Sequence, residues 1–162
     1  MEPLIRTENS PINLPASFTS SSAEETFALG QRFAALLGRG SIVALKGALG
    51  AGKTCFAKGV ARSLGVKEEV TSPTYTIVSE YETSALPPQP ALLYHMDAYR
   101  LKGNDDFTAI GGEELIFADA VSLIEWSERI EDSIPPQAIV VDIQLAEDGK
   151  RLIRMYTKAG GR

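Results

Sequence analysis

The chain has 162 residues, of which 44% are apolar, and it carries a formal net charge of -5 with a pI near 5.0. This length and apolar content are sufficient for one packed domain and leave no room for a second full domain. The acidic balance excludes a broad basic face for DNA or RNA, because phosphate contacts need clustered lysine and arginine. We therefore expect any connection with RNA to be indirect.

The cysteine content and the start of the chain indicate a compartment. A single cysteine, Cys55, excludes an internal disulfide and a cysteine metal cage, and is typical of a reducing cytosol. The first residues lack the basic-then-apolar order of a secretory signal, and no apolar run reaches membrane-spanning length. We expect a cytoplasmic protein without a membrane association.

The N-terminal part of the chain divides into an arm and the start of a domain. Residues 1–19 contain three prolines without apolar periodicity, which predicts an extended arm before a domain over residues 20–158 and a tail over 159–162. Residues 22–25 have the Ser-x-x-Glu form of a capping box, and apolar residues then follow at helical spacing as far as Gly38. This pattern predicts a helix with one buried face.

Short apolar runs alternate with helical segments along the rest of the chain. Strands are predicted over residues 41–46, 70–81, 91–96, 121–124, 138–145 and 151–157. Helical segments are predicted after residue 54 as far as Gly65, and over 113–118 and 127–132. Asp148-Gly149 marks a hairpin turn between the last two strands. The alternation predicts a single α/β domain, with a sheet that is parallel at its centre and antiparallel at one edge, where the hairpin lies.

A glycine-rich loop follows the strand over 41–46. Residues 47–54 read Gly-Ala-Leu-Gly-Ala-Gly-Lys-Thr and match the Gly-x-x-x-x-Gly-Lys-Ser/Thr pattern of a P-loop in full. A strand enters the loop and a helix leaves it, so free backbone amides and the positive end of the helix dipole point at an anion. This predicts a P-loop NTPase fold, in which Lys53 reaches the β and γ phosphates and Thr54 is a ligand of Mg²⁺. A glycine turn followed by a surface lysine is the weaker alternative.

A P-loop site needs an acidic residue at the end of a neighbouring strand to support the magnesium ion. Asp97 and Glu125 each follow an apolar strand, and spacing alone does not rank them. Alternation along a strand places His95 on the same face as Asp97. We interpret His95 as a packed, hydrogen-bonded residue rather than a general base, and Trp126 as a core residue rather than a cover for the site.

Two further features are candidate parts of the site. Residues 72–75, Ser-Pro-Thr-Tyr, form a stiff turn in which Thr74 would sense a γ-phosphate, although ordinary proline turn chemistry explains the pattern slightly better. Cys55 lies in the first helical turn after the loop, where a thiol pKa can be depressed. We interpret Cys55 as a passive small residue, because no histidine or second cysteine accompanies it.

The class of P-loop protein follows from what surrounds the loop. The Asn-Lys-x-Asp segment that reads guanine is absent, which favours adenine. Small-molecule kinases use an arginine-rich lid over the transferred phosphate. The candidate arginines are scattered along the sequence: Arg100, Arg129, Arg151 and Arg154. A small-molecule kinase and a nucleotide-sensing scaffold are the alternatives to an ATPase.

Four segments in the same order resemble those of a bacterial ATPase family of tRNA threonylcarbamoyladenosine biosynthesis, called TsaE or YjeE. They are the loop over 47–54, residues 72–75, the sequence His-Met-Asp-Ala-Tyr-Arg-Leu over 95–101, and Leu-Ile-Glu-Trp over 123–126. The resemblance extends from about residue 20 to residue 156. It implies a magnesium-dependent ATP-binding protein with weak ATPase activity that works with two partner proteins, TsaB and TsaD. The partners carry out threonylcarbamoyl transfer to tRNA, and the ATP cycle of this chain resets their complex.

The resemblance also implies roles for individual residues. Thr54 and Glu125 complete the magnesium site, and Asp97 assists hydrolysis, so that Asp97 and Glu125 are the expected catalytic residues. Ser20 closes over the adenine. The expected nucleotide-binding residues are Ser20, Leu49, Gly50, Ala51, Gly52, Lys53, Thr54 and Cys55.

The sequence departs from the family pattern at three places. Family members usually have an acidic residue where Ala48 stands and a threonine where Cys55 stands. The first change reduces negative charge beside the phosphates, and the second removes one hydroxyl that could contact the α-phosphate. A proline-rich insert over residues 87–90 is specific to this chain. We therefore expect the two loop substitutions to alter nucleotide affinity and turnover rate.

Overall fold

The computed structural model describes residues 10–71, 77–84 and 92–161. Thr74, with the predicted turn over 72–75, and the proline-rich insert over 87–90 lie outside the described residues. Within the described ranges, no helix combines the length and the apolar character needed to cross a membrane.

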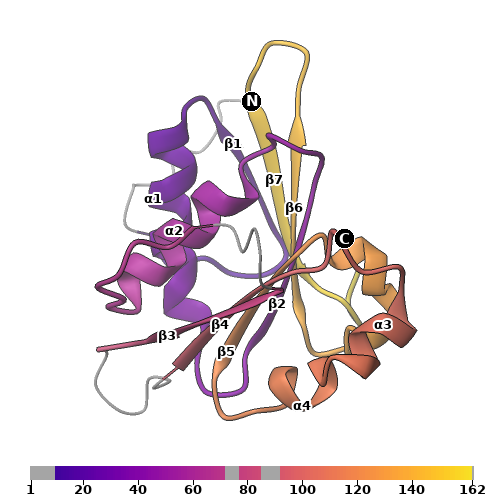
Figure 1. Cartoon of the computed structure of the whole chain (residues 1–162). Coiled ribbons are helices and arrows are strands. Elements are labelled where there is room, and N and C mark those ends of the chain that lie inside the picture. Colours follow the sequence, from indigo (N-terminus) through magenta and orange to yellow (C-terminus); the bar gives the residue numbers. More distant parts are fainter. Residues whose placement is uncertain (1–9, 72–76, 85–91, 162) are drawn as a thin grey trace.

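A seven-stranded sheet runs through the middle of the molecule in the order β1-β7-β6-β2-β5-β4-β3 (Figure 1). The strands are β1 (Ala16–Ser20), β2 (Ile42–Lys46), β3 (Val78–Glu82), β4 (Leu92–Asp97), β5 (Val121–Glu125), β6 (Ile139–Leu145) and β7 (Arg151–Thr157). Strands β6, β2, β5 and β4 are parallel, which confirms the predicted parallel centre.

The sheet is antiparallel at both edges, so the prediction of a single antiparallel edge was wrong. The predicted hairpin of β6 and β7 forms one edge together with β1, and β3 pairs antiparallel with β4 at the other. The connection between Glu82 and Leu92 is shorter than the dozen or so residues that a parallel crossover needs. An antiparallel pair was therefore the only arrangement open to these two strands.

The chain also enters the sheet earlier than the predicted arm over residues 1–19 allowed. Strand β1 pairs with β7 from Ala16 opposite Met155 to Ser20 opposite Arg151. Alternate residues of β1 face inward, because Ala16 and Ser20 are buried while the residues next to them are exposed. This alternation is only five residues long and directly follows Pro15, which is why the sequence pattern missed it.

Helices cover both faces of the sheet (Figure 1). They are α1 (Ala23–Phe33), α2 (Lys53–Ser63), α3 (Asn104–Ala109) and α4 (Gly112–Ile116), with 3-10 segments η1 (Ala34–Leu36) and η2 (Ser127–Ser133). Ser22 caps α1 as predicted, since its side chain accepts a hydrogen bond from the backbone amide of Glu25 at 3.1 Å. Helices α1 and α2 touch closely, and a Cβ atom at Gly59 would lie 2.1 Å from the carbonyl oxygen of Phe27.

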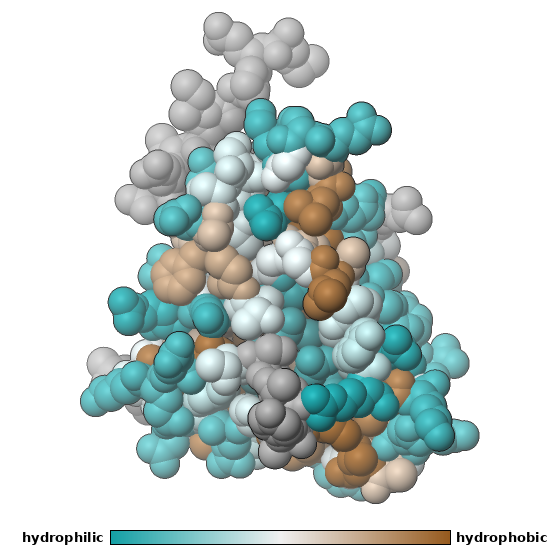
Figure 2. Space-filling model, turned by 45° about the horizontal axis from the view of Figure 1, so that its top comes forward, coloured by the Kyte–Doolittle hydropathy of each residue, from teal (hydrophilic) through white to brown (hydrophobic). Residues whose placement is uncertain are grey.

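Two apolar clusters fill the space between the sheet and its two helical layers. Strand β5 shows the division, because Leu123 faces the cluster beneath α1 and α2 while Ile124 faces the cluster beneath α3 and α4. Alternation then places Glu125, the last residue of β5, on the same face as Leu123 and therefore beneath the start of α2. Figure 2 shows one face of the surface, on which hydrophilic side chains predominate and hydrophobic ones gather in several separate groups.

Candidate functional site

The glycine-rich loop connects β2 to α2 and depends on backbone conformations that favour glycine. Gly47, Gly50 and Gly52 have φ values of 143°, 79° and 114°, a region that other residues adopt only with strain. A Cβ atom at Gly47 would also lie 2.4 Å from the carbonyl oxygen of Ile143 in β6. The predicted order of strand, loop and helix is confirmed, and the glycines allow the loop to fold back over the start of α2.

Lys53 is the first residue of α2 and lies almost fully buried inside the loop, with 5% of its surface exposed. Its Nζ donates hydrogen bonds to the carbonyl oxygens of Gly47 and Ala48, the latter at 3.0 Å. The same ammonium lies 4.0 Å from the centre of the Trp126 ring, a cation–π contact. Burial lowers the pKa of Lys53, although nearby carboxylates, Glu125 foremost, oppose this change.

Thr54, Glu125 and His95 form a chain of hydrogen bonds across three elements. The Thr54 hydroxyl in α2 donates to Oε1 of Glu125 at 2.9 Å, and the His95 Nε2 in β4 lies 2.5 Å from Oε2 of the same carboxylate. His95 is 0% exposed and Glu125 is 3% exposed. The interpretation of His95 as a packed, hydrogen-bonded residue is confirmed, because so deeply buried a ring cannot meet a substrate directly. It instead fixes the orientation of Glu125.

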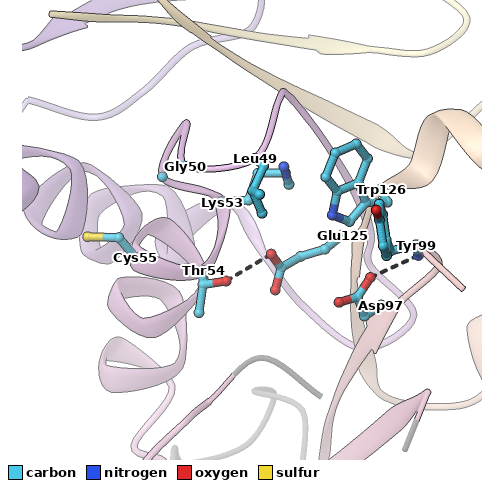
Figure 3. Close-up of a pocket in the computed structure, with 10 residues that line it drawn as sticks. Leu49, Gly50, Lys53, Thr54, Cys55, Asp97, Tyr99, Glu125 and Trp126 are labelled. Carbon is cyan, nitrogen blue, oxygen red and sulfur yellow. Dashed lines mark hydrogen bonds between the residues drawn. The ribbon is translucent and has the colours of Figure 1, made fainter. Parts of the chain in front are cut away.

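Asp97 lies directly opposite Glu125 in the register of β4 and β5. Its Oδ1 accepts a hydrogen bond from the backbone amide of Tyr99 at 2.9 Å, which orients the carboxylate at the end of the strand. The structure therefore brings both candidate acids to the same edge of the sheet (Figure 3). They differ in their contacts, since it is Glu125 that touches the Thr54 hydroxyl.

A cavity of about 350 Å³ opens between the loop and the ends of β4 and β5. Its lining consists of Leu49, Gly50, Gly52, Lys53, Thr54, Cys55, Asp97, Tyr99, Glu125 and Trp126. In Figure 3 the Thr54 and Glu125 side chains point toward one another, and the rings of Trp126 and Tyr99 lie together at the side of Asp97. Eight of the expected site residues thus meet at one cavity: Leu49, Gly50, Gly52, Lys53, Thr54, Cys55, Asp97 and Glu125.

Comparison with known proteins agrees with this geometry. The model of the family described as Threonylcarbamoyl adenosine biosynthesis protein TsaE matches residues 20–153. The chain belongs to the TsaE family. The tRNA threonylcarbamoyladenosine biosynthesis protein TsaE of Treponema pallidum is 42% identical over 134 residues, which cover 83% of this chain and 95% of the relative. The protein of the same name from Bacillus subtilis is 40% identical, over 86% of this chain and 83% of the relative.

A solved structure supports the same relationship at the level of the fold. The crystal structure of Bacillus subtilis YdiB superimposes with a TM-score of 0.69 and 34% sequence identity. The match covers 91% of this chain and 89% of that one. The resemblance that four short segments indicated therefore extends over most of this TsaE family member.

Trp126 contributes more to the site than the sequence suggested. It packs against the cluster beneath α3 and α4, as a core residue does, but it also lines the cavity and covers Lys53. Its backbone has a φ of 57°, a left-handed conformation that is costly for a tryptophan and that turns the chain sharply after β5. The interpretation as a core residue alone was wrong, because this turn gives the ring two environments.

Ser20 lies apart from the lining of the cavity. It is 2% exposed at the end of β1, its hydroxyl donates to the carbonyl oxygen of Ser22 at 2.8 Å, and it lies 2.7 Å from the Thr26 hydroxyl. The predicted contact of Ser20 with adenine stays a prediction. Thr26 in turn borders the loop, since its methyl group would lie 3.5 Å from a Cβ atom at Gly52.

Cys55 lines the cavity, but its side chain points away from the two carboxylates (Figure 3). The Sγ donates to the carbonyl oxygen of Ala23 at 3.2 Å. Burial raises the pKa of this thiol, against the opposing effect of the positive charges of Arg151 and Lys58. The thiol is therefore protonated at neutral pH, in keeping with a passive residue.

Two residues near the loop were missed as site residues by the sequence reasoning. Tyr99 lines the cavity and packs against Trp126, with the ring centres 5.0 Å apart and the ring planes tilted by 52°. Arg151 was counted only among scattered arginines, yet it contacts the loop from β7. Tyr99 could have been found from its place two residues after Asp97, whereas the position of Arg151 depends on how distant strands pair.

Proposed function

We propose that this chain is a P-loop ATPase that binds ATP with Mg²⁺ in the cavity and hydrolyses it slowly, in support of threonylcarbamoyladenosine formation on tRNA. We further propose that it acts with TsaB-like and TsaD-like partners in the cytoplasm and meets tRNA only through them. The observation that carries the proposal is the Thr54 hydroxyl at 2.9 Å from the Glu125 carboxylate, beside the buried Lys53. The names of the relatives, all of them TsaE proteins, supply the pathway.

The donor set of the cavity fits magnesium. The Thr54 hydroxyl and the carboxylate of Glu125 are hard oxygen ligands of the kind that Mg²⁺ prefers. Within the described ranges, no group of three or more His, Cys, Asp and Glu side chains could hold a metal by itself. We therefore expect the ion to arrive with the nucleotide, since Mg²⁺ usually keeps several waters and takes further ligands from phosphates.

The charges around Lys53 support a role for magnesium. The negative charges of Glu125, Glu128 and Asp97 all favour the charged form of Lys53, so three carboxylates lie near enough to act on the one ammonium. A nucleoside triphosphate in this cavity is repelled by those negative charges. A bound divalent cation would offset both this repulsion and the negative charge that develops on the phosphates during hydrolysis. Lys53 binds the β and γ phosphates after leaving the carbonyl oxygens of its own loop, while the loop amides orient them.

The hydrogen bonds divide the work between the two acids. Both carboxylate oxygens of Glu125 are already engaged, one by Thr54 and one by His95, which suits a fixed support for the magnesium shell. Asp97 lies beside it and lines the cavity, where its carboxylate can orient the attacking water. Glu125 therefore supports the metal and Asp97 assists hydrolysis.

A Thr54→Val variant tests the proposal directly. Valine keeps the shape of the side chain but removes the hydroxyl that meets Glu125. In a mixture with purified TsaB and TsaD homologues and tRNA, ATP turnover and threonylcarbamoyladenosine formation are expected to fall at least about tenfold. Thr19→Val, on the exposed side of β1, is the matched control and should behave as wild type. Full activity in Thr54→Val, or no nucleotide binding by the wild-type protein, would sink the proposal.

The same mixture distinguishes the two alternatives. A small-molecule kinase would transfer the phosphoryl group of ATP to a metabolite, so labelled phosphate would appear on an acceptor rather than in solution. A nucleotide-sensing scaffold would still support tRNA modification when Asp97→Asn abolishes turnover. Neither outcome is expected if hydrolysis drives the cycle of the partner complex.

We expect nucleotide binding to change the fluorescence of Trp126. This is the only tryptophan of the chain, and the Lys53 ammonium lies 4.0 Å from its ring. When Lys53 moves to the phosphates, the positive charge over the Trp126 ring is lost. The intensity of the tryptophan emission should therefore change as ATP and Mg²⁺ are added, until the site is saturated. A titration followed at the tryptophan emission, with Lys53→Met as the control without a signal, measures this. An unchanged spectrum in a sample shown by calorimetry to bind ATP contradicts the prediction.

A further inference from the structure

Arg151 touches the phosphate loop from the opposite end of the sequence. It is the first residue of β7, and its Nε donates a hydrogen bond to the carbonyl oxygen of Ala51 at 2.7 Å. A terminal guanidinium nitrogen lies 3.5 Å from the carbonyl oxygen of Gly50. The side chain also packs on the backbone of Gly52, where a Cβ atom would lie 3.2 Å from the Arg151 Nε.

These contacts fall on a part of the loop that is flanked by glycines on both sides. Ala51 lies between Gly50 and Gly52, which both have positive φ values, 79° and 114°. Glycine loses more conformational freedom on ordering than any other residue, so a segment of this kind needs restraint from outside the loop. Arg151 supplies that restraint from outside.

The geometry of the peptide group connects this restraint with the phosphates. In a trans peptide the carbonyl and the following N–H point in opposite directions. Because Arg151 holds the Ala51 carbonyl, the Gly52 N–H points away from Arg151, and Gly52 lines the cavity. Holding the carbonyl outward therefore keeps an amide donor directed inward, where backbone N–H groups bind phosphate.

The restraint also differs from those that Lys53 provides. The Lys53 ammonium now bonds the carbonyl oxygens of Gly47 and Ala48, and these bonds must break when it turns to a nucleotide. Arg151 contacts the carbonyl oxygens of Gly50 and Ala51, which a phosphate does not replace, so nucleotide binding does not require these contacts to break. We propose that Arg151 is a positioning residue, which holds the peptide groups of residues 50–52 in the orientation that binds phosphate. This inference rests on the proposed binding of nucleotide at the loop.

Arg151→Gln and Arg154→Gln are the matched pair of variants for a test. Arg154 lies on the same strand and pairs instead with Asp142, at 3.4 Å. In the nucleotide-free protein, hydrogen exchange of a peptide covering residues 47–54 is expected to be faster in Arg151→Gln than in wild type and Arg154→Gln. With ATP and Mg²⁺ as the probe, Arg151→Gln should raise the Kd and KM about five- to tenfold and leave kcat nearly unchanged. A residue that mattered only for folding would not separate KM from kcat in this way.

The outcomes separate this inference from the proposed function. If the wild-type protein binds no ATP, the proposed function fails, and hydrogen exchange still decides whether Arg151 holds the loop. If wild type binds ATP and Arg151→Gln matches it in both exchange and affinity, the inference is overturned. Should Arg151→Gln not fold, Arg151→Lys takes its place, with a compact ammonium instead of a planar guanidinium fork. That variant is expected to bind ATP about two- to threefold more weakly than wild type. If its hydrogen exchange and its ATP affinity both equal those of wild type, the inference is likewise overturned.

Discussion

A Lys53→Met variant is expected to lose ATP binding by about 100-fold or more while its ligand-free form melts at a higher temperature than wild type. The loss follows because Lys53 is the buried ammonium of the loop, and removing one partner of a buried charged contact costs about 2–5 kcal/mol. The gain in stability follows from burial, which lowers the pKa of Lys53 and shows that the fold disfavours its charged form. Methionine has a similar length and carries no charge.

The sign of the stability effect can be checked by pH. Because the pKa of Lys53 is lower in the folded than in the unfolded chain, the cost of its charge is fully present below the lowered pKa. This cost disappears as the pH rises toward 10.5, the ordinary value, so the advantage of Lys53→Met should shrink over that range. Calorimetry with ATP and thermal melting at several pH values measure both effects. Lys58→Met, an exposed position of the same helix, is the control, and ATP affinity within tenfold of wild type in Lys53→Met would contradict the prediction.

A Glu125→Gln variant is expected to bind ATP but to hydrolyse it at least about 100-fold more slowly, with a higher requirement for Mg²⁺. Glutamine retains an oxygen that can accept from the Thr54 hydroxyl, so the local structure should be kept. It lacks the negative charge that supports the metal, and electrostatic groups of this kind typically contribute a factor of about 10²–10³ to turnover. The kcat should therefore fall, and half-saturation by Mg²⁺ should shift to higher concentration.

Asp97→Asn provides the comparison that separates the two acids. It is expected to lower kcat with little change in the magnesium dependence, because Asp97 is assigned to the water rather than to the metal shell. Glu128→Gln, an exposed acid on η2 that also acts on Lys53, is the control for a general loss of negative charge. A magnesium dependence that changes in Asp97→Asn and stays normal in Glu125→Gln would reverse the assignment.

The elements that bracket the loop could be predicted because their signals are local. A short apolar run ends just before the first glycine of the loop and predicts the strand. Apolar residues after Lys53 recur at helical spacing and predict the helix, and neither signal depends on distant contacts. The apolar pattern of the edge strand β3 fits either direction, and its orientation was missed because the length of its connection to β4 decides it. β1 was missed because only its pairing with β7 makes the five residues after Pro15 into a strand.

The composition of the site could be predicted, but the roles within it could not. Asp97 and Glu125 have the same sequence signal, an acid after an apolar run, and only the register and the contact with Thr54 distinguish them. Trp126 could not be placed because its left-handed backbone turn gives one ring both a core and a cavity environment. The sequence does show the glycine-rich loop followed by the segments that contain Asp97, Glu125 and Trp126. The family match over residues 20–153 is consistent with that order.

The contact between Ala51 and Arg151 joins residues that are 100 positions apart, and β1 at the edge of the sheet pairs with β7 alone. During synthesis the glycine-rich loop therefore leaves the ribosome long before β7, which carries Arg151. Strand β1 likewise has no pairing partner until β7 has been synthesised. A nascent chain halted before Arg151 contains every glycine of the loop but neither its outer support nor the partner of β1. We expect firm ATP binding to begin only once Arg151 and β7 have been synthesised, so that products that end before Arg151 bind nucleotide more weakly than chains that contain it.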